Sequence, residues 1–514
     1  MKRMKRLTLL LLICILAAPS SQAAAGTPSA GKIINRCQKA SGGNAFKRVK
    51  SVVMSGSLKT AEISDGRFTL RSQSPDRLRI DVDAGSRKQS ECYNGKSAWR
   101  VDSRGLRTLL GVEAKRLRLE ALLFSGRLQD LSRNRVLPGQ PQKTTVEGRD
   151  AYAIEFVKDD ARLKLFFDAS SGLLVKQESQ TADGLQEVFY WNHRPVEGVM
   201  EPFSIKIKDG AGEALVTIDR VEHNRAPEEA AFRYPQVEGS RPLPELEPLM
   251  KSIVANQEKI EELREHYTCL VTETERKLDG SGRIKESVTK VYEVTPVGEE
   301  FVERLMSVDG KELWASERDK EDRRVQKEVE DIIKRREKKQ EKKDRAAARG
   351  EKPEEDKDNI TILDFLRLSE VTSVRREVFG GHEVIAFDFE PRKGIKPRNR
   401  AETIVSKLAG TMWVDEDAQQ IARVEARLTD SFKMGGGLVA SISPSTAMVF
   451  EQEKVGGEIW LPSFAEANIS ARVLLFAKFN RSFVRRYSDY KKYQIDSAYE
   501  LTGPKQKPKP DNER

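Results

Sequence analysis

The chain has 514 residues, more than a single hydrophobic core usually organises, so we expect two to four domains. Hydrophobic residues make up 38% and charged residues 33%, the balance of a soluble protein with ordinary cores. The formal net charge of +10 is mild for this length and argues against a nucleic-acid partner, although it would suit contact with anionic lipid headgroups.

Residues 1–25 have the three parts of a secretory signal peptide. A positive segment is followed by an apolar run from Leu7 to Ala18 and by the small-x-small site Ser21-Gln22-Ala23. The apolar run is too short to span a bilayer, and no later segment is long and uncharged enough to do so. Cys14 lies inside this run and does not follow a small residue at the cleavage site, which argues against a lipid anchor. We expect an exported, periplasmic protein whose mature chain has no integral membrane segment.

Residues 26–226 are predicted to form the first domain. Ile33 to Ala40 is predicted as a helix that ends at Ser41-Gly42-Gly43, because glycine commonly terminates helices. Leu78, Ile80 and Val82 alternate with charged residues, the pattern of a strand with one apolar and one polar face. Residues 227–248 contain several prolines and glutamates without periodicity and are predicted to be a linker.

Residues 249–500 are predicted to form the second domain, which opens with an amphipathic helix from Leu249 to Tyr267. Its residues 319–358 are almost wholly charged and predict one exposed helical insert, supported by ion pairs between residues four apart. A solvated helical arm is favoured for this insert over a dedicated interaction element. The Pro- and Lys-rich residues 501–514 are predicted to be a disordered tail.

An internal repeat relates the two predicted domains. In each copy a glycine precedes a phenylalanine by eight residues, as expected for a turn followed by an alternating strand. An aspartate then precedes a glutamate by ten residues across a second predicted hairpin, and a third matching segment follows. The matched segments are Gly148–Phe156 and Gly381–Phe389, Asp168–Glu178 and Asp415–Glu425, and Val196–Pro202 and Val455–Pro462. The chain is therefore predicted to contain two tandem copies of one unit.

Four segments of the first copy form a set. They are the helix ending in Ala-Ser-Gly-Gly at Gly43, the segment Pro75–Val82, the turn Tyr93–Trp99 and the hairpin Asp168–Gly172. As a set they resemble the LolA/LolB superfamily of lipoprotein carriers and receptors, and the second copy resembles it more loosely. The resemblance implies an α+β fold of two tandem, curved antiparallel β-sheets, or incomplete barrels, each covered by helices on its concave face.

The resemblance also implies a function. Family carriers hold the acyl chains of lipoproteins in an apolar cavity, so we expect a periplasmic carrier or binding protein that moves lipoproteins or other acylated amphiphiles between the inner and outer membranes. An inner-membrane release complex and an outer-membrane receptor would be its partners. Family carriers have one domain, whereas this chain has two copies. A regulatory branch resembling RseB/MucB adds a second domain, so an envelope-stress regulatory or scaffold protein acting through protein contacts is the alternative.

An acyl chain needs apolar area rather than positioned polar groups, since each buried methylene contributes about 0.8 kcal/mol. Period-two alternation does not say which apolar face meets a ligand and which meets a covering helix, and core packing is the competing interpretation. The candidates for the cavity wall are Leu70, Leu78, Ile80, Val82, Trp99, Ile154, Phe156 and Leu165.

The sequence has no recognisable catalytic or metal-binding motif. None of the four histidines is paired with another at a spacing of four, and none neighbours a cysteine. No G-x-S-x-G elbow occurs, and no G-x-G-x-x-G follows a strand. We therefore predict a protein that is not an enzyme and needs no metal or cofactor; an enzyme acting on envelope polymers is disfavoured. Cys37 and Cys92 could form a disulfide, which would leave Cys269 free or paired with another chain; alternatively, all three are packing residues.

Overall fold

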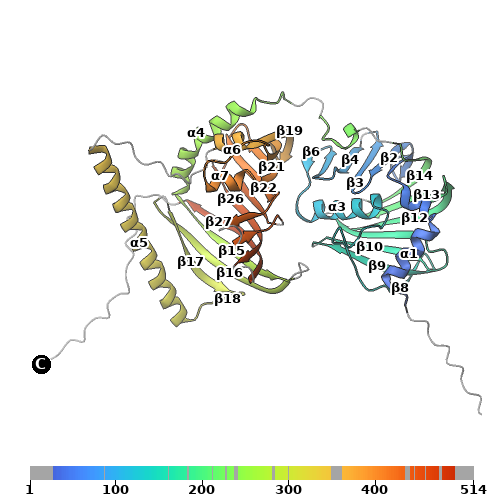
Figure 1. Cartoon of the computed structure of the whole chain (residues 1–514), viewed down its shortest axis with the longest axis horizontal. Helices are drawn as coiled ribbons and strands as arrows, with labels where there is room; N and C mark the ends of the chain where they lie inside the picture. Colours follow the sequence, from blue (N-terminus) through green and yellow to red (C-terminus); the bar gives the residue numbers. More distant parts are fainter. Residues whose placement is uncertain are drawn as a thin grey trace, which may run out of the picture. The chain divides into compact units, whose positions relative to one another are not determined.

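The structure is a computed structural model that describes residues 27–492, except 86, 160, 182–183, 211, 226–228, 237–240, 280–283, 299, 349–361, 435–439, 445, 458 and 474–476. The predicted signal peptide and the predicted tail lie outside the described residues, as does the end of the charged insert. The chain divides into two compact units, coloured along the sequence in Figure 1. Unit 1 comprises residues 1–86, 92–96 and 110–231, and unit 2 comprises residues 87–91, 97–109 and 232–514.

The first large sheet has 14 strands within the described residues, and its described pairings are antiparallel. Its order is β6-β5-β4-β3-β2-β1-β14-β13-β12-β11-β10-β9-β7, and β8 also pairs with β9. Its strands are β1 (Ser51–Thr60), β2 (Gly66–Gln73), β3 (Arg77–Ala84), β4 (Arg87–Tyr93), β5 (Ala98–Asp102), β6 (Gly105–Thr108), β7 (Leu137–Pro138), β8 (Gln142–Val146), β9 (Arg149–Lys158), β10 (Ala161–Asp168), β11 (Leu174–Thr181), β12 (Gly184–Val196), β13 (Val199–Asp209) and β14 (Gly212–His223). Its helices are α1 (Ala30–Ala40), α2 (Asn44–Arg48) and α3 (Gly111–Ser125).

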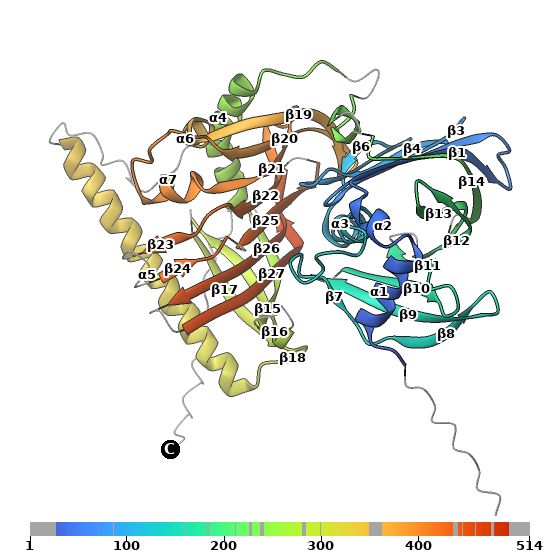
Figure 2. The ribbon, with the colours of Figure 1, turned by 45° about the vertical axis from the view of Figure 1, so that its right-hand side comes forward.

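One helix meets strands from distant parts of the first sheet. Helix α3 packs against β2 and β3 on one side and against β9 and β10 on the other. In Figure 2 these strands lie on different sides of α3. The register places Met54, Leu70 and Ile80 on one face of β1, β2 and β3, because they are cross-strand neighbours. The main core of unit 1 consists of Ile33, Ile34, Cys37, Leu119, Leu122, Leu123, Leu128, Val136, Ile154, Phe156, Ala161, Leu163, Leu165 and Phe167.

The second large sheet runs β18-β17-β16-β15-β27-β26-β25-β22-β21-β20-β19, with β23 and β24 beside it. Its strands are β15 (Tyr267–Leu278), β16 (Ile284–Val297), β17 (Glu300–Val308), β18 (Lys311–Glu312), β19 (Ser369–Phe379), β20 (His382–Pro391), β21 (Leu408–Asp415), β22 (Gln420–Leu428), β23 (Phe432–Met434), β24 (Ala440–Ile442), β25 (Ala447–Val455), β26 (Ile459–Val473) and β27 (Ala477–Lys492). The helical elements are the 3-10 helix η1 (Glu229–Phe232) and the α-helices α4 (Leu246–Arg264), α5 (Ala315–Ala348), α6 (Ile362–Leu368) and α7 (Arg400–Val405). The core of unit 2 joins Leu249, Met250 and Ile253 of α4 to Phe387 and Phe389 of β20.

The two sheets share one strand order. The first contains the path β9-β10-β11-β12-β13-β14-β1-β2-β3, and the second contains β20-β21-β22-β25-β26-β27-β15-β16-β17. In each, the last strand of the copy pairs with its first long strand, β14 with β1 and β27 with β15. The repeat seen in the sequence is therefore also a repeat of topology.

The hairpin turns of the two copies also correspond. Glu147 and Gly148 have φ of 47° and 80°, and Gly380 and Gly381 have φ of 57° and 83°. Two successive residues with positive φ form the turn that matches the twist of a two-residue hairpin, and this conformation favours glycine. The third repeated segment behaves in the same way, since Glu197-Gly198 and Gly456-Gly457 both have positive φ values.

The α+β class and the two large antiparallel sheets predicted from the sequence are confirmed. The closure of each sheet into an incomplete barrel stays a prediction. Cys37, Cys92 and Cys269 are buried, and Cys37 and Cys92 are not joined in a disulfide. Within the described part of the chain, no helix combines the length and the apolar character needed to cross a membrane.

Candidate functional site

The interior of unit 1 contains a cavity of about 90 Å³ on the face of the sheet that carries α3. Most of its wall is apolar and comes from both helices and strands. The apolar lining residues are Cys37, Phe46, Leu123, Phe124, Leu128, Leu165, Leu173, Leu174, Met200 and Pro202. We call this space the inner cavity.

A buried ion pair lies at the wall of the inner cavity. The Arg127 guanidinium donates to Glu201 Oε1 at 3.0 Å, and the side chains are only 6% and 3% exposed. His223 Nε2 lies 3.0 Å from the same oxygen. Burial alone would raise the pKa of Glu201, but Arg127 and His223 outweigh it and hold that pKa below its usual range. The Glu201 carboxylate therefore stays ionised inside the protein.

A second polar group of the inner cavity joins α3 to the sheet. Gln177 donates to Glu120 Oε1 at 2.8 Å, and Arg116 donates to Glu120 Oε2 at 2.8 Å. The Tyr190 hydroxyl donates to Gln177 Oε1 at 3.4 Å, and burial raises the pKa of Tyr190 far above its ordinary value. These groups satisfy one another, so they cross-link the wall rather than offer a reactive atom.

The Cys37 thiol is one of the groups that line the inner cavity. Burial raises the pKa of Cys37 to about 11, although Ser41 partly opposes the shift. A thiol with so high a pKa carries almost no thiolate at neutral pH, and the thiolate is the reactive form. Cys37 is therefore an apolar packing residue of the wall.

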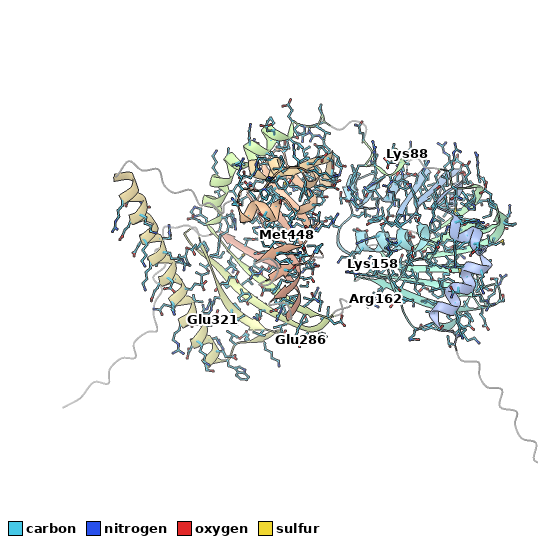
Figure 3. The ribbon with its side chains drawn as sticks, in the orientation of Figure 1. Lys88, Lys158, Arg162, Glu286, Glu321 and Met448 are labelled. Atoms are coloured by element: carbon cyan, nitrogen blue, oxygen red, sulfur yellow. The ribbon has the colours of Figure 1, made fainter. Side chains whose placement is uncertain are left out.

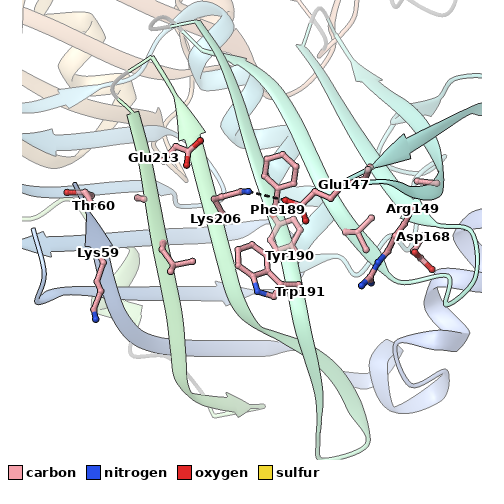
Figure 4. Close-up of a pocket in the computed structure, with 15 residues that line it drawn as sticks. Lys59, Thr60, Glu147, Arg149, Asp168, Phe189, Tyr190, Trp191, Lys206 and Glu213 are labelled. Atoms are coloured by element: carbon pink, nitrogen blue, oxygen red, sulfur yellow. Dashed lines mark hydrogen bonds and ion pairs between the residues drawn. The ribbon is translucent and has the colours of Figure 1, made fainter. Parts of the chain in front are cut away.

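The opposite face of the same sheet carries an open groove of about 590 Å³, shown in Figure 4. Phe189 and Trp191 of β12 lie in this outer groove, and the Lys206 ammonium sits 4.7 Å and 6.0 Å from their ring centroids. Lys206 also pairs with Glu147 at 3.0 Å, the contact dashed in Figure 4. Trp191 is 37% exposed, so part of the wall of the outer groove is open to solvent.

The residues predicted to form the cavity wall occupy several places. Leu70, Leu78, Trp99, Ile154, Phe156 and Leu165 are buried, and Ile80 and Val82 are half-buried. Ile154, Phe156 and Leu165 share the core cluster with Leu119 and Leu122 of α3. Of the eight, Leu165 lines the inner cavity. Trp99 packs beside Tyr234 with 6.0 Å between ring centroids. A ligand-binding role for this set stays a prediction.

Sequence reasoning missed helix α3 and the residues that it brings to the inner cavity. The run Leu117-Arg118-Leu119-Glu120-Ala121-Leu122-Leu123-Phe124 is rich in strong helix formers, and that signal could have identified the helix. The Arg127–Glu201 pair had no such signal, since its members are 74 residues apart.

Within the described residues, no three His, Cys, Asp or Glu side chains are placed to hold a metal ion. Of the polar side chains that line the inner cavity, Arg127 pairs with Glu201 and Gln177 donates to Glu120. Ser41, Tyr190 and His193 line it as well, and the rest of its wall is apolar.

Comparison with known proteins finds similarity only at the level of solved structures. No family model matches the chain. No curated protein matches it either. A LolA superfamily protein from Nitrosomonas europaea is 16% identical, and the match covers 40% of this chain and 98% of that chain with a TM-score of 0.29. A DUF1329 family protein from Desulfovibrio piger is 12% identical, with the same coverages and TM-score.

A third solved structure, MucB in complex with MucA(peri), matches over more of the chain. It is 8% identical, and the match covers 89% of this chain and 94% of that chain with a TM-score of 0.16. These likenesses concern the fold alone. With TM-scores of 0.29 and below, they carry no conclusion about the function of this chain.

Proposed function

We propose that unit 1 binds the acyl chain of a lipoprotein, or of another acylated amphiphile, in the inner cavity, and that the protein carries this cargo through the periplasm between the inner and outer membranes. The observation that supports the proposal most is the wall of the inner cavity, which is apolar and is shared between a helix and strands of one sheet. Such a wall gains about 0.8 kcal/mol for each methylene that it takes from water.

The size of the inner cavity sets a condition on this function. A cavity of about 90 Å³ is too small to enclose a long acyl chain whole. We therefore propose that its wall opens when such a chain binds. Helix α1 is tied to the end of α3 by Gln38, whose amide donates to the carbonyls of Arg127 and Leu128 at 3.2 and 3.0 Å. A shift of α3 would also break the hydrogen bonds from Gln177 to Glu120 and from Ser125 to the Arg77 carbonyl, so water or the ligand would have to replace them.

The polar groups of the wall give the cavity a place for the polar part of an amphiphile. Arg127 and Glu201 line the inner cavity beside Phe46 and Phe124, and the Arg127 guanidinium lies 4.8 Å and 5.6 Å from those rings. A few polar groups among apolar ones fix the orientation of a ligand without chemistry. We accordingly propose a binding protein and not an enzyme.

Two measurements test the proposal. Mass spectrometry of an organic extract of gently purified protein should find an acylated amphiphile. In a fluorescence titration with a dansyl-labelled fatty acid, Met200→Trp should abolish uptake because the larger side chain fills the inner cavity. Trp191→Ala is the matched control, since it alters an aromatic position of the same sheet on the outer groove and should leave uptake unchanged.

The outcomes distinguish the inner cavity from the outer groove as the binding site, and the carrier from the regulatory or scaffold function. Loss of uptake in Trp191→Ala with normal uptake in Met200→Trp would move the site to the outer groove. The absence of any extracted amphiphile together with no uptake by the unaltered protein would reject the carrier function and favour the regulatory or scaffold protein.

A further inference from the structure

We propose that the C-terminal half of α5, residues 334–348, docks the protein on an anionic phospholipid surface. We call this segment the basic arm. The proposal goes beyond the binding of an acyl chain, and it holds whether or not the inner cavity is occupied.

The first observation concerns the position of α5 in the chain. Helix α3 follows the short strand β6 in the first copy, and α5 follows the short strand β18 in the second. Helix α3 contributes Leu119, Leu122 and Leu123 to a core. Among the described side chains of α5, Ile332 is the aliphatic residue that is buried. Because α5 has so little apolar surface, it cannot pack into the core of its copy as α3 does.

The second observation is that the first half of α5 is fixed to the sheet and its charges are matched. Glu321, labelled in Figure 3, accepts a hydrogen bond from the Leu305 backbone at 2.7 Å. Arg324 pairs with Glu321 at 2.7 Å, and Arg304 of β17 pairs with Asp322 at 2.5 Å. At the start of the basic arm, Arg335 still pairs with Glu300 at 2.6 Å. Residues 315–333 contain five Lys or Arg and seven Asp or Glu. This half of the helix is an anchor on β17 and has no excess of positive charge.

The third observation is that the basic arm has the opposite balance. Residues 334–348 contain eight Lys or Arg and three Asp or Glu, a net charge of +5. At 100° per residue the three acids, at positions 337, 341 and 344, fall within one narrow stripe, and the basic residues cover the other faces. Lys334, Lys338 and Lys342 follow one another at intervals of four, are exposed, and make no ion pair within the described residues. Their charge is therefore available to a partner.

The residue types favour a lipid surface over a protein partner. Interfaces between proteins are depleted of lysine and depend on buried aromatic and arginine anchors. The described side chains of the basic arm are polar and exposed, and its sequence contains no aromatic residue. A layer of phosphate headgroups needs no fixed geometry, and each Lys or Arg near it contributes about 1 kcal/mol of attraction. The row of Lys334, Lys338 and Lys342 extends over about 12 Å of helix and matches such a surface.

Sedimentation with vesicles tests the proposal. The unaltered protein should bind vesicles of phosphatidylcholine with phosphatidylglycerol at low ionic strength, should not bind vesicles of phosphatidylcholine alone, and should dissociate as salt screens the charges. The triple variant Lys334→Gln, Lys338→Gln, Lys342→Gln should lose about a hundredfold in partition coefficient. Glutamine is a good helix former, so circular dichroism should show that α5 is retained.

The matched control removes the same charge from the same unit outside the basic arm. Lys285, Lys311 and Lys320 are exposed and make no ion pair in the described residues, and their change to glutamine should alter binding less than threefold. An equal loss in both triple variants would overturn the proposal, as would binding that ignores phosphatidylglycerol. Stronger binding to a single-stranded oligonucleotide than to the anionic vesicles would overturn it in favour of a general polyanion site.

Discussion

Arg127 and Glu201 form a 3.0 Å ion pair in which both side chains are almost completely buried, although they are 74 residues apart in the chain. The pair connects the segment that follows α3 to strand β13, and it lies in the wall of the inner cavity. Its burial makes it sensitive to the loss of either partner, because a single buried charge without its counterion is costly.

Arg127→Met should therefore destabilise unit 1 by about 3–5 kcal/mol. The double variant Arg127→Met, Glu201→Met should be more stable than the single one, because it removes both charges. Urea unfolding followed by circular dichroism measures the difference. A single variant as stable as the unaltered protein would show that the pair is solvated in solution.

Asp168 is expected to make part of the stability dependent on pH. Burial would raise the pKa of Asp168, but hydrogen bonds from the backbone and hydroxyl groups of Ser171 and Ser170 lower it from 3.8 to about 2. A carboxyl whose pKa is lower in the folded state stabilises the fold above its unfolded pKa, and this contribution is lost as the pH falls through the folded value. The loss should therefore occur between about pH 4 and about pH 2.

Asp168→Asn tests this assignment. The variant should be less stable by about 1–2 kcal/mol at neutral pH, because the turn loses a charged acceptor. Its melting temperature should approach that of the unaltered protein as the pH falls towards 2. A difference that stays constant with pH would mean that Asp168 is not the titrating group.

Leu78 and Ile80 point to the same face of β3 but are buried to different degrees. Leu78 is 1% exposed, whereas Ile80 is half-buried. Leu78→Asp should therefore prevent stable folding of unit 1, and Ile80→Asp should cost less, because burial of an unpaired charge sets the penalty. Leu215→Asp is the control, since Leu215 is 42% exposed on the outer groove and should tolerate the charge. Equal melting temperatures for all three variants would refute the burial of this face.

Phe156 and Phe389 occupy corresponding positions of the two copies. They are 0% and 1% exposed and belong to different core clusters. Each change to alanine should cost about 3–5 kcal/mol, because it leaves a cavity in a packed core. Limited proteolysis should then release fragments from unit 1 in Phe156→Ala and from unit 2 in Phe389→Ala. The same fragments from both variants would show that the copies do not unfold separately.

Much of the local structure was predictable from the sequence. The alternation at Leu78, Ile80 and Val82 is a strand, and the hairpin turns at Gly148 and Gly381 lie where the repeat placed them. The long charged helix also occurs, as α5. The binding site was much less predictable. Leu165 alone among the eight predicted wall residues lines the inner cavity, and α3 was missed although it supplies part of the wall.

The sequence by itself determined the hairpins, the repeat and the α+β class, because strand alternation and turn formation depend on residues that are close together in the chain. Only the tertiary structure decided that β14 pairs with β1, that α3 meets distant strands of one sheet, and that Arg127 meets Glu201. These contacts join residues far apart in the chain, and they depend on how whole elements pack, which no local pattern encodes. The inner cavity is a product of that packing. The charge of the basic arm is given by the sequence, and the exposure of its described side chains is given by the fold.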